Sequence, residues 1–512
     1  MAFTRAPMEN TEQNKQISLM YQWDSRFDSS GNQDTLFQNA LVEPVGNEYY
    51  HVLKRDGIEA VTLPAGGTVG AVIGTYFWSS KTSNPFIITI TIGPSNVAFC
   101  NIYNVDQVTG TIGFTGTTSL ANTVRYETEV FFEEFLYDNG TVDLFFTIPA
   151  GLYRITNAGA VTGPIPTGVT AGGNPVFLDG YLFLCTSSDI FNSNLNDPLT
   201  WSASNFISVE SYPDKLRTIQ RVGTYIVAFG TESVQYFYNA ANPTGTPLAA
   251  NVGATKRVGL LGGLTTFGDQ AFFIGTSTAG SASLYVLQGL KIEALTSYPF
   301  SRFWQGQAST NDTTNFPKGS ILQLNGHTVY YMHTPVAVSA IPPVTTPSGV
   351  SYYYDIDTKF WSKITYQNTA FLLTQSAWSA AIARGVGRMT YFNRMNDNSL
   401  YRFNPSLYQD SGTNFDVKFR TRSDNYGTQR MKFMNRLLIV GDLTSAPSNL
   451  SVQWTDDDYQ TFSTARTVDM SKTFQQLYAG GSFRTRAFQF TYSDNYPMRW
   501  RSVEFDYSQG QT

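Results

Sequence analysis

Acidic clusters and scattered histidines are the residues in this chain whose types and spacing could do chemistry. Four glutamates lie within the segment YETEVFFEEF: Glu127, Glu129, Glu133 and Glu134. Paired carboxylates serve as acid and as base or nucleophile in glycosidases. Glu127 and Glu129, however, alternate with the apolar Val130 and Phe132. This pattern predicts a strand whose carboxylates share one solvated face.

A second acidic cluster, Asp456, Asp457 and Asp458, lies in SVQWTDDDYQTFS. A calcium loop alternates its ligands with spacer residues and needs a glycine and a distal bidentate glutamate. This segment has neither in place. We therefore expect an Asp-box-like β-hairpin in which the acidic residues cap the turn.

The three histidines are His51, His327 and His333. The last two are six residues apart in one expected hairpin, but no third ligand follows at the spacing of zinc sites. The sequence also lacks a phosphate-binding loop and a G-x-S-x-G nucleophile motif. The residues therefore predict no catalytic residue, no metal site and no cofactor, and hence a protein that is not an enzyme.

The elements that must position these residues are short strands joined by tight turns. Asp179-Gly180 and Asn325-Gly326 stand beside apolar, aromatic-rich runs, which is typical of two-residue hairpins. The segment Tyr354–Trp361, YDIDTKFW, has the form of a blade's last hairpin, with an Asp closing the turn and a Trp packing between sheets. Repeated four-stranded meanders of this kind predict a β-propeller.

We expect an all-β fold in which a β-propeller with loop insertions spans residues 1–410. About six blades fit this length, and the spacing also accommodates seven. The sequence pattern changes near residue 411, and the tetrapeptide SDNY then occurs at Ser423–Tyr426 and again at Ser493–Tyr496. Residues 411–512 are therefore expected to form a small β-sandwich. The one helix we consider is a short segment near Lys472–Tyr478.

Composition excludes several classes of function. Charged residues make up 14% of the chain, aromatics 15%, and the net charge is −5 with no run of Lys or Arg. A protein that grips nucleic acid needs clustered cations to neutralise phosphates. No apolar stretch has a bilayer-spanning length, and the first residues lack a signal-peptide core. Cys100 and Cys185 lie in apolar runs and are expected to be buried free thiols.

Residues 179–304 carry motifs whose order is more specific than any one of them. In sequence these are Asp179, Gly180, Asp197, Pro198, Trp201, Phe206, Pro213, Asp214, Gly230, Glu232 and Ser233. This order resembles the packaged-DNA stabilisation proteins of short-tailed bacteriophages, which are also called tail hub or nozzle proteins. The chain departs from the family at the acidic turn, where we expect a glycine and Tyr459 is present.

The resemblance implies a structural virion protein that forms a homomeric ring, with six copies expected, below the portal and its adaptor. Such a ring retains packaged double-stranded DNA and conducts it during ejection without sequence-specific binding. The adaptor and tail fibre, spike or needle proteins are the further partners implied. The implied location is the virion tail, after synthesis in the cytoplasm of the host bacterium. For the eleven motif residues we expect structural or interface roles.

Two other classes of function stay open at this stage. A carbohydrate-binding or depolymerising propeller that acts on the host surface would also use an aromatic-rich surface and an Asp-box-like hairpin. It would need a central pocket with convergent carboxylates or arginines, and the sequence shows no such set. A propeller scaffold in a cellular complex is the third class, which ring formation in isolation would distinguish.

Overall fold

The computed structural model describes residues 12–17, 36–45, 49–68, 70–80, 84–124, 128–168, 172–295, 301–304, 317–334, 349–374, 377–395 and 397–510. These residues are almost entirely β-strands and turns, with short 3-10 turns at Pro94–Asn96 and Val252–Ala254. The expected all-β fold is confirmed. The helix considered near Lys472–Tyr478 is wrong, because Gln476–Tyr478 is a strand (β38) that pairs with β35 (Lys432–Gly441).

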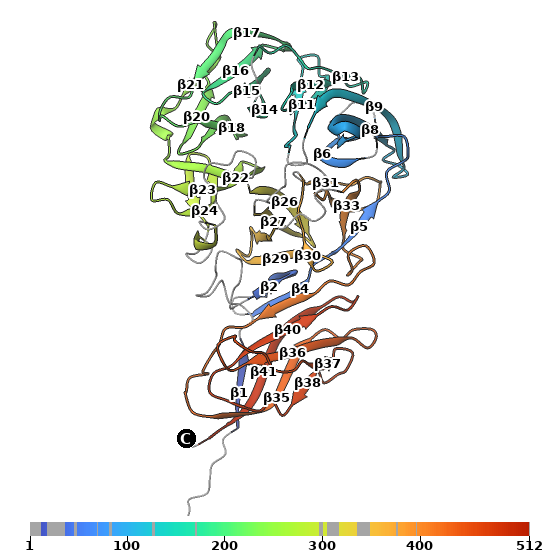
Figure 1. Ribbon diagram of the computed structural model, residues 1–512, viewed down its shortest axis with the longest axis vertical. Coiled ribbons are helices and arrows are strands. Elements are labelled where there is room, and N and C mark those ends of the chain that lie inside the picture. Colours follow the sequence, from blue (N-terminus) through green and yellow to red (C-terminus); the bar gives the residue numbers. More distant parts are fainter. Residues whose placement is uncertain are drawn as a thin grey trace, which may run out of the picture.

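Six separate four-stranded sheets form blades around a common centre (Figure 1). One blade has β6 (Ala71–Trp78), β7 (Phe86–Ile92), β8 (Val97–Val105) and β9 (Ile112–Thr123). The next has β10 (Phe131–Leu136), β11 (Val142–Ile148), β12 (Gly151–Ile155) and β13 (Val161–Thr162). It is followed by β14 (Gly172–Leu178), β15 (Tyr181–Cys185), β16 (Asp189–Asn194) and β17 (Asp197–Ser208). Then come β18 (Leu216–Val222), β19 (Tyr225–Gly230), β20 (Val234–Asn239) and β21 (Leu248–Ala250).

The two remaining separate blades complete this set of six. One has β22 (Val258–Phe267), β23 (Gln270–Ser277), β24 (Ala282–Gln288) and β25 (Lys291–Ala294). The other has β31 (Trp378–Ala380), β32 (Met389–Asn393), β33 (Leu400–Asn404) and, from the other end of the chain, β5 (Gly57–Val61). Pairing of β5 with β33 closes the ring of blades with an N-terminal strand. The expected propeller of about six blades is thereby confirmed.

A further four-stranded unit takes the seventh position that the spacing also accommodated. Its strands are β26 (Lys318–Leu324), β27 (His327–His333), β28 (Ser351–Asp355) and β29 (Trp361–Tyr366). It shares one apolar core with the β22–β25 blade, around Phe272 and Tyr330, and another with the β31–β33 blade, around Tyr331 and Phe392. Burial of large apolar side chains between neighbouring sheets is therefore what holds the blades together.

The hairpin turns form where the sequence predicts them. Asp179 and Gly180 have φ values of 50° and 80°, and Asn325 and Gly326 have 46° and 86°. Asn, Asp and Gly tolerate this left-handed region, so they fit two-residue turns. In the YDIDTKFW segment, Asp355 accepts backbone hydrogen bonds from Asp357 and Thr358, as expected of the turn-closing residue.

The C-terminal strands build a second body below the blades (Figure 1). One of its sheets has the order β3 (Ala40–Val45), β4 (Tyr49–Lys54), β41 (Arg499–Gln509), β35 and β38, and β1 (Glu12–Ile17) also pairs with β41. Residues from both ends of the chain thus share this sheet. A division of the chain at residue 410 stays a prediction. Strands β1 and β4 of the segment expected in the propeller pair with the C-terminal strand β41, and β3 joins the same sheet by pairing with β4.

A continuous ten-stranded sheet joins the two bodies. β2 (Leu36–Gln38) pairs with β29 of the propeller and with β34 (Val417–Arg420). The sheet continues through β40 (Ala487–Tyr492), β36 (Asn449–Thr455) and β37 (Arg466–Asp469). In the described part of the chain, no helix has the length and apolar character needed to cross a membrane.

Candidate functional site: the central cavity of the propeller

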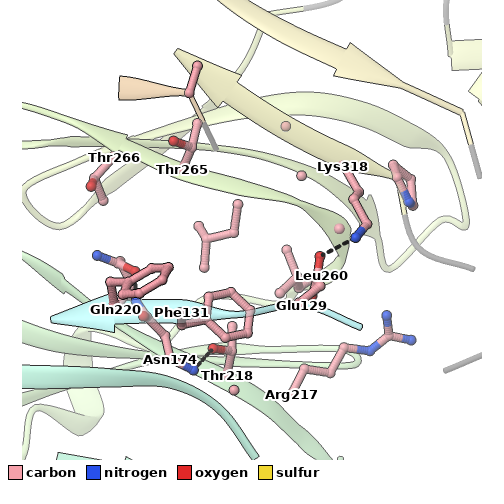
Figure 2. A pocket seen from close by; sticks show the side chains of 18 of the residues that line it. Glu129, Phe131, Asn174, Arg217, Thr218, Gln220, Leu260, Thr265, Thr266 and Lys318 are labelled. Carbon is pink, nitrogen blue, oxygen red and sulfur yellow. Dashed lines mark hydrogen bonds and ion pairs between the residues drawn. The ribbon is translucent and has the colours of Figure 1, made fainter. Parts of the chain in front are cut away.

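A cavity of about 490 Å³ lies where the first strands of the blades converge. Its lining comes from β6, β10, β14, β18, β22, β26 and β31, so each four-stranded unit contributes its innermost strand. Cavities of about 300–1,000 Å³ with a few convergent polar groups are the usual form of small-molecule sites. This cavity is therefore the candidate site of the molecule (Figure 2).

Three charged side chains gather on one side of the cavity. The ammonium of Lys318 lies 3.8 Å from Oε1 of Glu129 and donates a hydrogen bond to the carbonyl of Thr374 at 3.1 Å. Arg217 donates from Nη1 to the carbonyl of Leu261 at 3.3 Å, and its burial lowers its pKa. Figure 2 places Glu129 between Lys318 and Arg217.

Neutral polar and aromatic groups form the other side. The side-chain amide of Asn174 donates to Oε1 of Gln220, and the hydroxyl of Thr218 accepts a hydrogen bond from the backbone N–H of Asn174 at 3.3 Å. Phe131 and Gln220 are on the side of the view away from Lys318 (Figure 2). The inward positions Thr218 and Gln220 alternate with the buried Ile219, as a strand with one polar and one apolar face requires.

Glu133 lines the same cavity and is held by the neighbouring blade. Its Oε1 accepts a hydrogen bond from the backbone N–H of Phe177 at 2.9 Å. Burial raises the pKa of Glu133 from 4.5 to about 7, opposed by this hydrogen bond and by Arg221. Glu134 instead accepts hydrogen bonds from the hydroxyls of Tyr76, at 2.9 Å, and Ser80.

The predicted solvated face concerned Glu127 and Glu129, and of these Glu129 is 43% exposed at the cavity. Glu133 and Glu134, by contrast, are held by partners on neighbouring strands. Consecutive residues of a strand point to opposite sides, and here each side is covered by a blade. Glu127 lies outside the described residues. No motif marks Lys318 or Arg217, because each becomes part of the site only when the blades converge.

The three histidines bond to different partners. His327 bonds through Nδ1 to Asp355 at 2.7 Å, which raises its pKa. His333 is buried against the hydroxyl of Tyr331, and burial lowers its pKa to about 3. His51 accepts hydrogen bonds from Arg499 in the C-terminal body. Among the described residues no group of three or more His, Cys, Asp or Glu side chains could hold a metal ion.

The acidic cluster at residues 456–458 is a turn, as the sequence predicts. Asp457 accepts hydrogen bonds from the backbone N–H groups of Gln460 and Thr461, at 3.1 and 3.0 Å. Asp456 pairs instead with the buried Arg486 at 2.7 Å. Tyr459 has a φ of 68°, a conformation that favours glycine, which explains why a glycine is expected there. Its hydroxyl bonds to Ser423 and Thr421.

Several motif residues build one turn at the edge of the β18–β21 blade. Oδ2 of Asp214 accepts hydrogen bonds from the backbone N–H groups of Glu232 and Ser233, at 2.8 and 2.9 Å, and Oδ1 accepts from the hydroxyl of Ser233. A side chain on Gly230 would overlap Oδ2 of Asp214. Pro213 precedes this turn and is exposed.

The other motif residues lie in the β14–β17 blade. Asp179, in the turn with Gly180, accepts a hydrogen bond from Asn239 of the next blade at 2.9 Å. Trp201 donates from Nε1 to the carbonyl of Pro198 at 2.9 Å and packs toward the β10–β13 blade. Asp197 caps the start of β17 through the N–H of Leu199. Phe206 is 43% exposed and stacks on Phe191.

The motif residues and the central cavity are therefore separate features. Within the described residues, none of the eleven motif positions lines the cavity. Most of them form turns or contacts between blades. Their expected structural or interface roles stay a prediction. Among the described motif residues, the exposed ones are Asp179, Phe206, Pro213 and Glu232.

Comparison with known proteins finds a family match over part of the chain. Residues 152–380 match the family model described as phage stabilisation, "Bacteriophage P22 Gp10, beta-propeller". The matched segment runs from β12 to β31 and contains all eleven motif residues. No curated protein matches the sequence at a significant level.

Similar solved structures include the N-terminal domain of Nup159, at 8% identity and a TM-score of 0.37, covering 72% of this chain and 98% of that chain. A fungal alcohol oxidase of the AA5 family, in complex with copper, is similar at 9% identity and a TM-score of 0.35, covering 90% and 97%. An exo-β-1,3-galactanase from Phanerochaete chrysosporium is similar at 11% and 0.21, covering 96% and 100%. Similarities at such low TM-scores support no conclusion about this chain.

Proposed function

Since residues 152–380 of the β-propeller match the bacteriophage stabilisation family, we propose that this chain is a phage structural protein and one subunit of a tail nozzle ring. The ring has six copies and lies below the portal and its adaptor. It retains the packaged double-stranded DNA and conducts it during ejection. The family match is the single observation that carries this proposal.

The charge of the chain supports passage of DNA without tight binding. Every phosphate that a protein neutralises adds affinity, and this would slow a moving duplex. The chain has a net charge of −5 and only 34 Lys and Arg in 512 residues. The proposed duct therefore contacts DNA without sequence-specific binding.

The sheet that joins the two bodies suits a subunit that must withstand mechanical force. The ten-stranded sheet runs from the β26–β29 unit into the C-terminal body without a break in pairing. A ring closes when each copy presents two different surfaces to its neighbours. The exposed motif residues Phe206 and Glu232 are available for such contacts or for contacts with the adaptor, fibre, spike or needle proteins. We place the assembled protein in the virion tail, after synthesis in the host cytoplasm.

The test is assembly with the adaptor of the same phage. The purified chain is mixed with adaptor rings and the mixture is analysed by sedimentation velocity, with double-stranded DNA titrated separately. We expect co-sedimentation with the adaptor and weak, salt-sensitive DNA binding. A chain that does not associate with the adaptor, or that binds one DNA sequence selectively, contradicts the proposal.

A carbohydrate-binding or depolymerising propeller is the second candidate function. The observation that favours it is the central cavity, which Glu129, Glu133 and Arg217 line together. This convergence is not visible in the sequence. Release of reducing ends from host surface polysaccharide by the purified chain would establish cleavage. Absence of such release, together with adaptor binding, would favour the nozzle.

A further inference from the structure

The central cavity has two chemically different sides. Lys318, Glu129 and Arg217 lie together on one side, and Phe131 and Gln220 lie on the other (Figure 2). The cavity extends between them and opens between the first strands of the blades. A ligand that fits both sides must combine an ionised group with a neutral, partly polar body.

The charged side favours an anionic group. It presents two cations against the carboxylate of Glu129, which is 43% exposed. The other carboxyl group of the lining is that of Glu133, and burial raises its pKa to about 7. The separation of 3.8 Å between Lys318 and Glu129 is longer than the about 2.7–2.9 Å of a direct charged hydrogen bond. Glu129 therefore does not hold the ammonium in a tight pair. The planar guanidinium of Arg217 suits bidentate contact with a carboxylate.

The neutral side suits a polyhydroxylated ring. The amides of Asn174 and Gln220 each carry both donors and acceptors, as do the hydroxyls of Thr265 and Thr266. Hydroxyl groups of a ligand need both kinds of partner. The partly exposed ring of Phe131 offers an apolar surface for the C–H face of such a ring.

We propose that the central cavity binds a carboxylated sugar of the hexuronic acid class. Its carboxylate lies toward Lys318 and Arg217, and its hydroxylated ring lies against Phe131, Asn174 and Gln220. The volume of about 490 Å³ accommodates one such unit. This site goes beyond the proposed nozzle function, because ring assembly requires no ligand inside the propeller.

The experiment is calorimetric titration of the full chain with three probes: D-glucuronate, D-glucose and acetate. Glucuronate carries both features of the proposed ligand, glucose only the hydroxyls, and acetate only the charge. We expect glucuronate to bind at least about tenfold more tightly than either of the others, as expected for about one added charged hydrogen bond. No glucuronate binding, or equal binding of glucuronate and glucose, overturns the proposal.

Charge substitutions of opposite sign locate the binding site. Arg217→Gln and Lys318→Gln should each weaken glucuronate binding about tenfold, and Glu129→Gln should strengthen it, because it removes a competing negative charge. Lys291→Gln is the matched control, since Lys291 is 75% exposed on the outer strand β25. Circular dichroism checks that each variant is folded. If Glu129→Gln weakens binding, or if Lys291→Gln has the same effect as Lys318→Gln, the assignment of the binding site is wrong. This outcome is independent of whether the chain forms a ring.

Discussion

Arg55 and Asp410 form a fully buried ion pair across 355 positions of the chain, with Nη2 of Arg55 2.7 Å from Oδ2 of Asp410. Arg55 lies between β4 of the C-terminal body and β5 of the propeller, and Asp410 lies between β33 and β34. The pair therefore links two crossings of the chain between the bodies. Arg55 also donates to Asn39, Asp56 and Thr365, so its donors are satisfied within the junction.

Removal of the charge on Asp410 should destabilise the protein strongly. Asp410→Asn leaves the buried Arg55 cation without its counter-charge, which typically costs about 3–5 kcal/mol. The measurement is the free energy of unfolding in urea. The matched control is Asp442→Asn, because the Asp442–Arg501 pair is 44% and 55% exposed and should contribute less than about 1 kcal/mol. Equal effects of the two substitutions would contradict a special role for the buried pair.

In the motif turn of the β18–β21 blade, the side chain of Asp214 should stabilise the fold, and the side chain of Glu232 should not. Asp214→Ala leaves the backbone N–H of Ser233 and its hydroxyl without their acceptor, at a cost of about 1–3 kcal/mol. Glu232→Ala removes an exposed side chain and should change stability by less than about 0.5 kcal/mol. Thermal unfolding of both variants, read together with ring assembly, separates the two roles. If Glu232 has an interface role, Glu232→Ala should weaken ring assembly without changing the stability of the chain.

Glu133 should make stability depend on pH in a defined direction. Burial raises its pKa from 4.5 to about 7 in the folded chain. Between these values the folded state holds a proton that the unfolded state has lost, so stability falls as pH rises through this range and is level above it. Glu133→Gln cannot titrate, so the difference in stability between wild type and variant should shrink or reverse between pH 4.5 and 7. A difference that stays constant with pH would contradict the buried, proton-binding state.

Cys100 and Cys185 should be unreactive in the folded protein. Both are fully buried thiols that form no disulfide, and burial raises the pKa of each thiol to about 12. Because the thiolate is the reactive form, a thiol reagent should label neither residue at pH 8 until denaturant is added, and then both. Fast labelling of a single thiol under native conditions would show that its blade opens.

Local features of the fold could be predicted from the sequence because they depend on neighbouring residues. The Asn325-Gly326 turn, the Asp355 cap and the acidic turn at Asp457 follow from the preferences of Asn, Asp and Gly for particular backbone conformations. The burial of Cys185 as a thiol follows from its apolar strand.

Pairing between distant segments could not be predicted in the same way. The placement of β1 beside β41, and of Arg55 beside Asp410, depends on contacts that leave no periodic pattern in either segment. The central cavity has the same origin, because Lys318, Glu129 and Arg217 come from three blades. The alternation of the polar Thr218 and Gln220 with Ile219 is visible in the sequence. Only the arrangement of the blades shows that these polar residues face the cavity.

The mass of this chain in solution shows whether it is a subunit of a ring. Light scattering of the purified full-length chain, with negative-stain images of the same sample, measures the number of copies and their arrangement. We expect a ring of several copies around a central hole, either alone or once the phage adaptor is added. A strict monomer that ignores the adaptor but binds or cleaves a surface polysaccharide would contradict it.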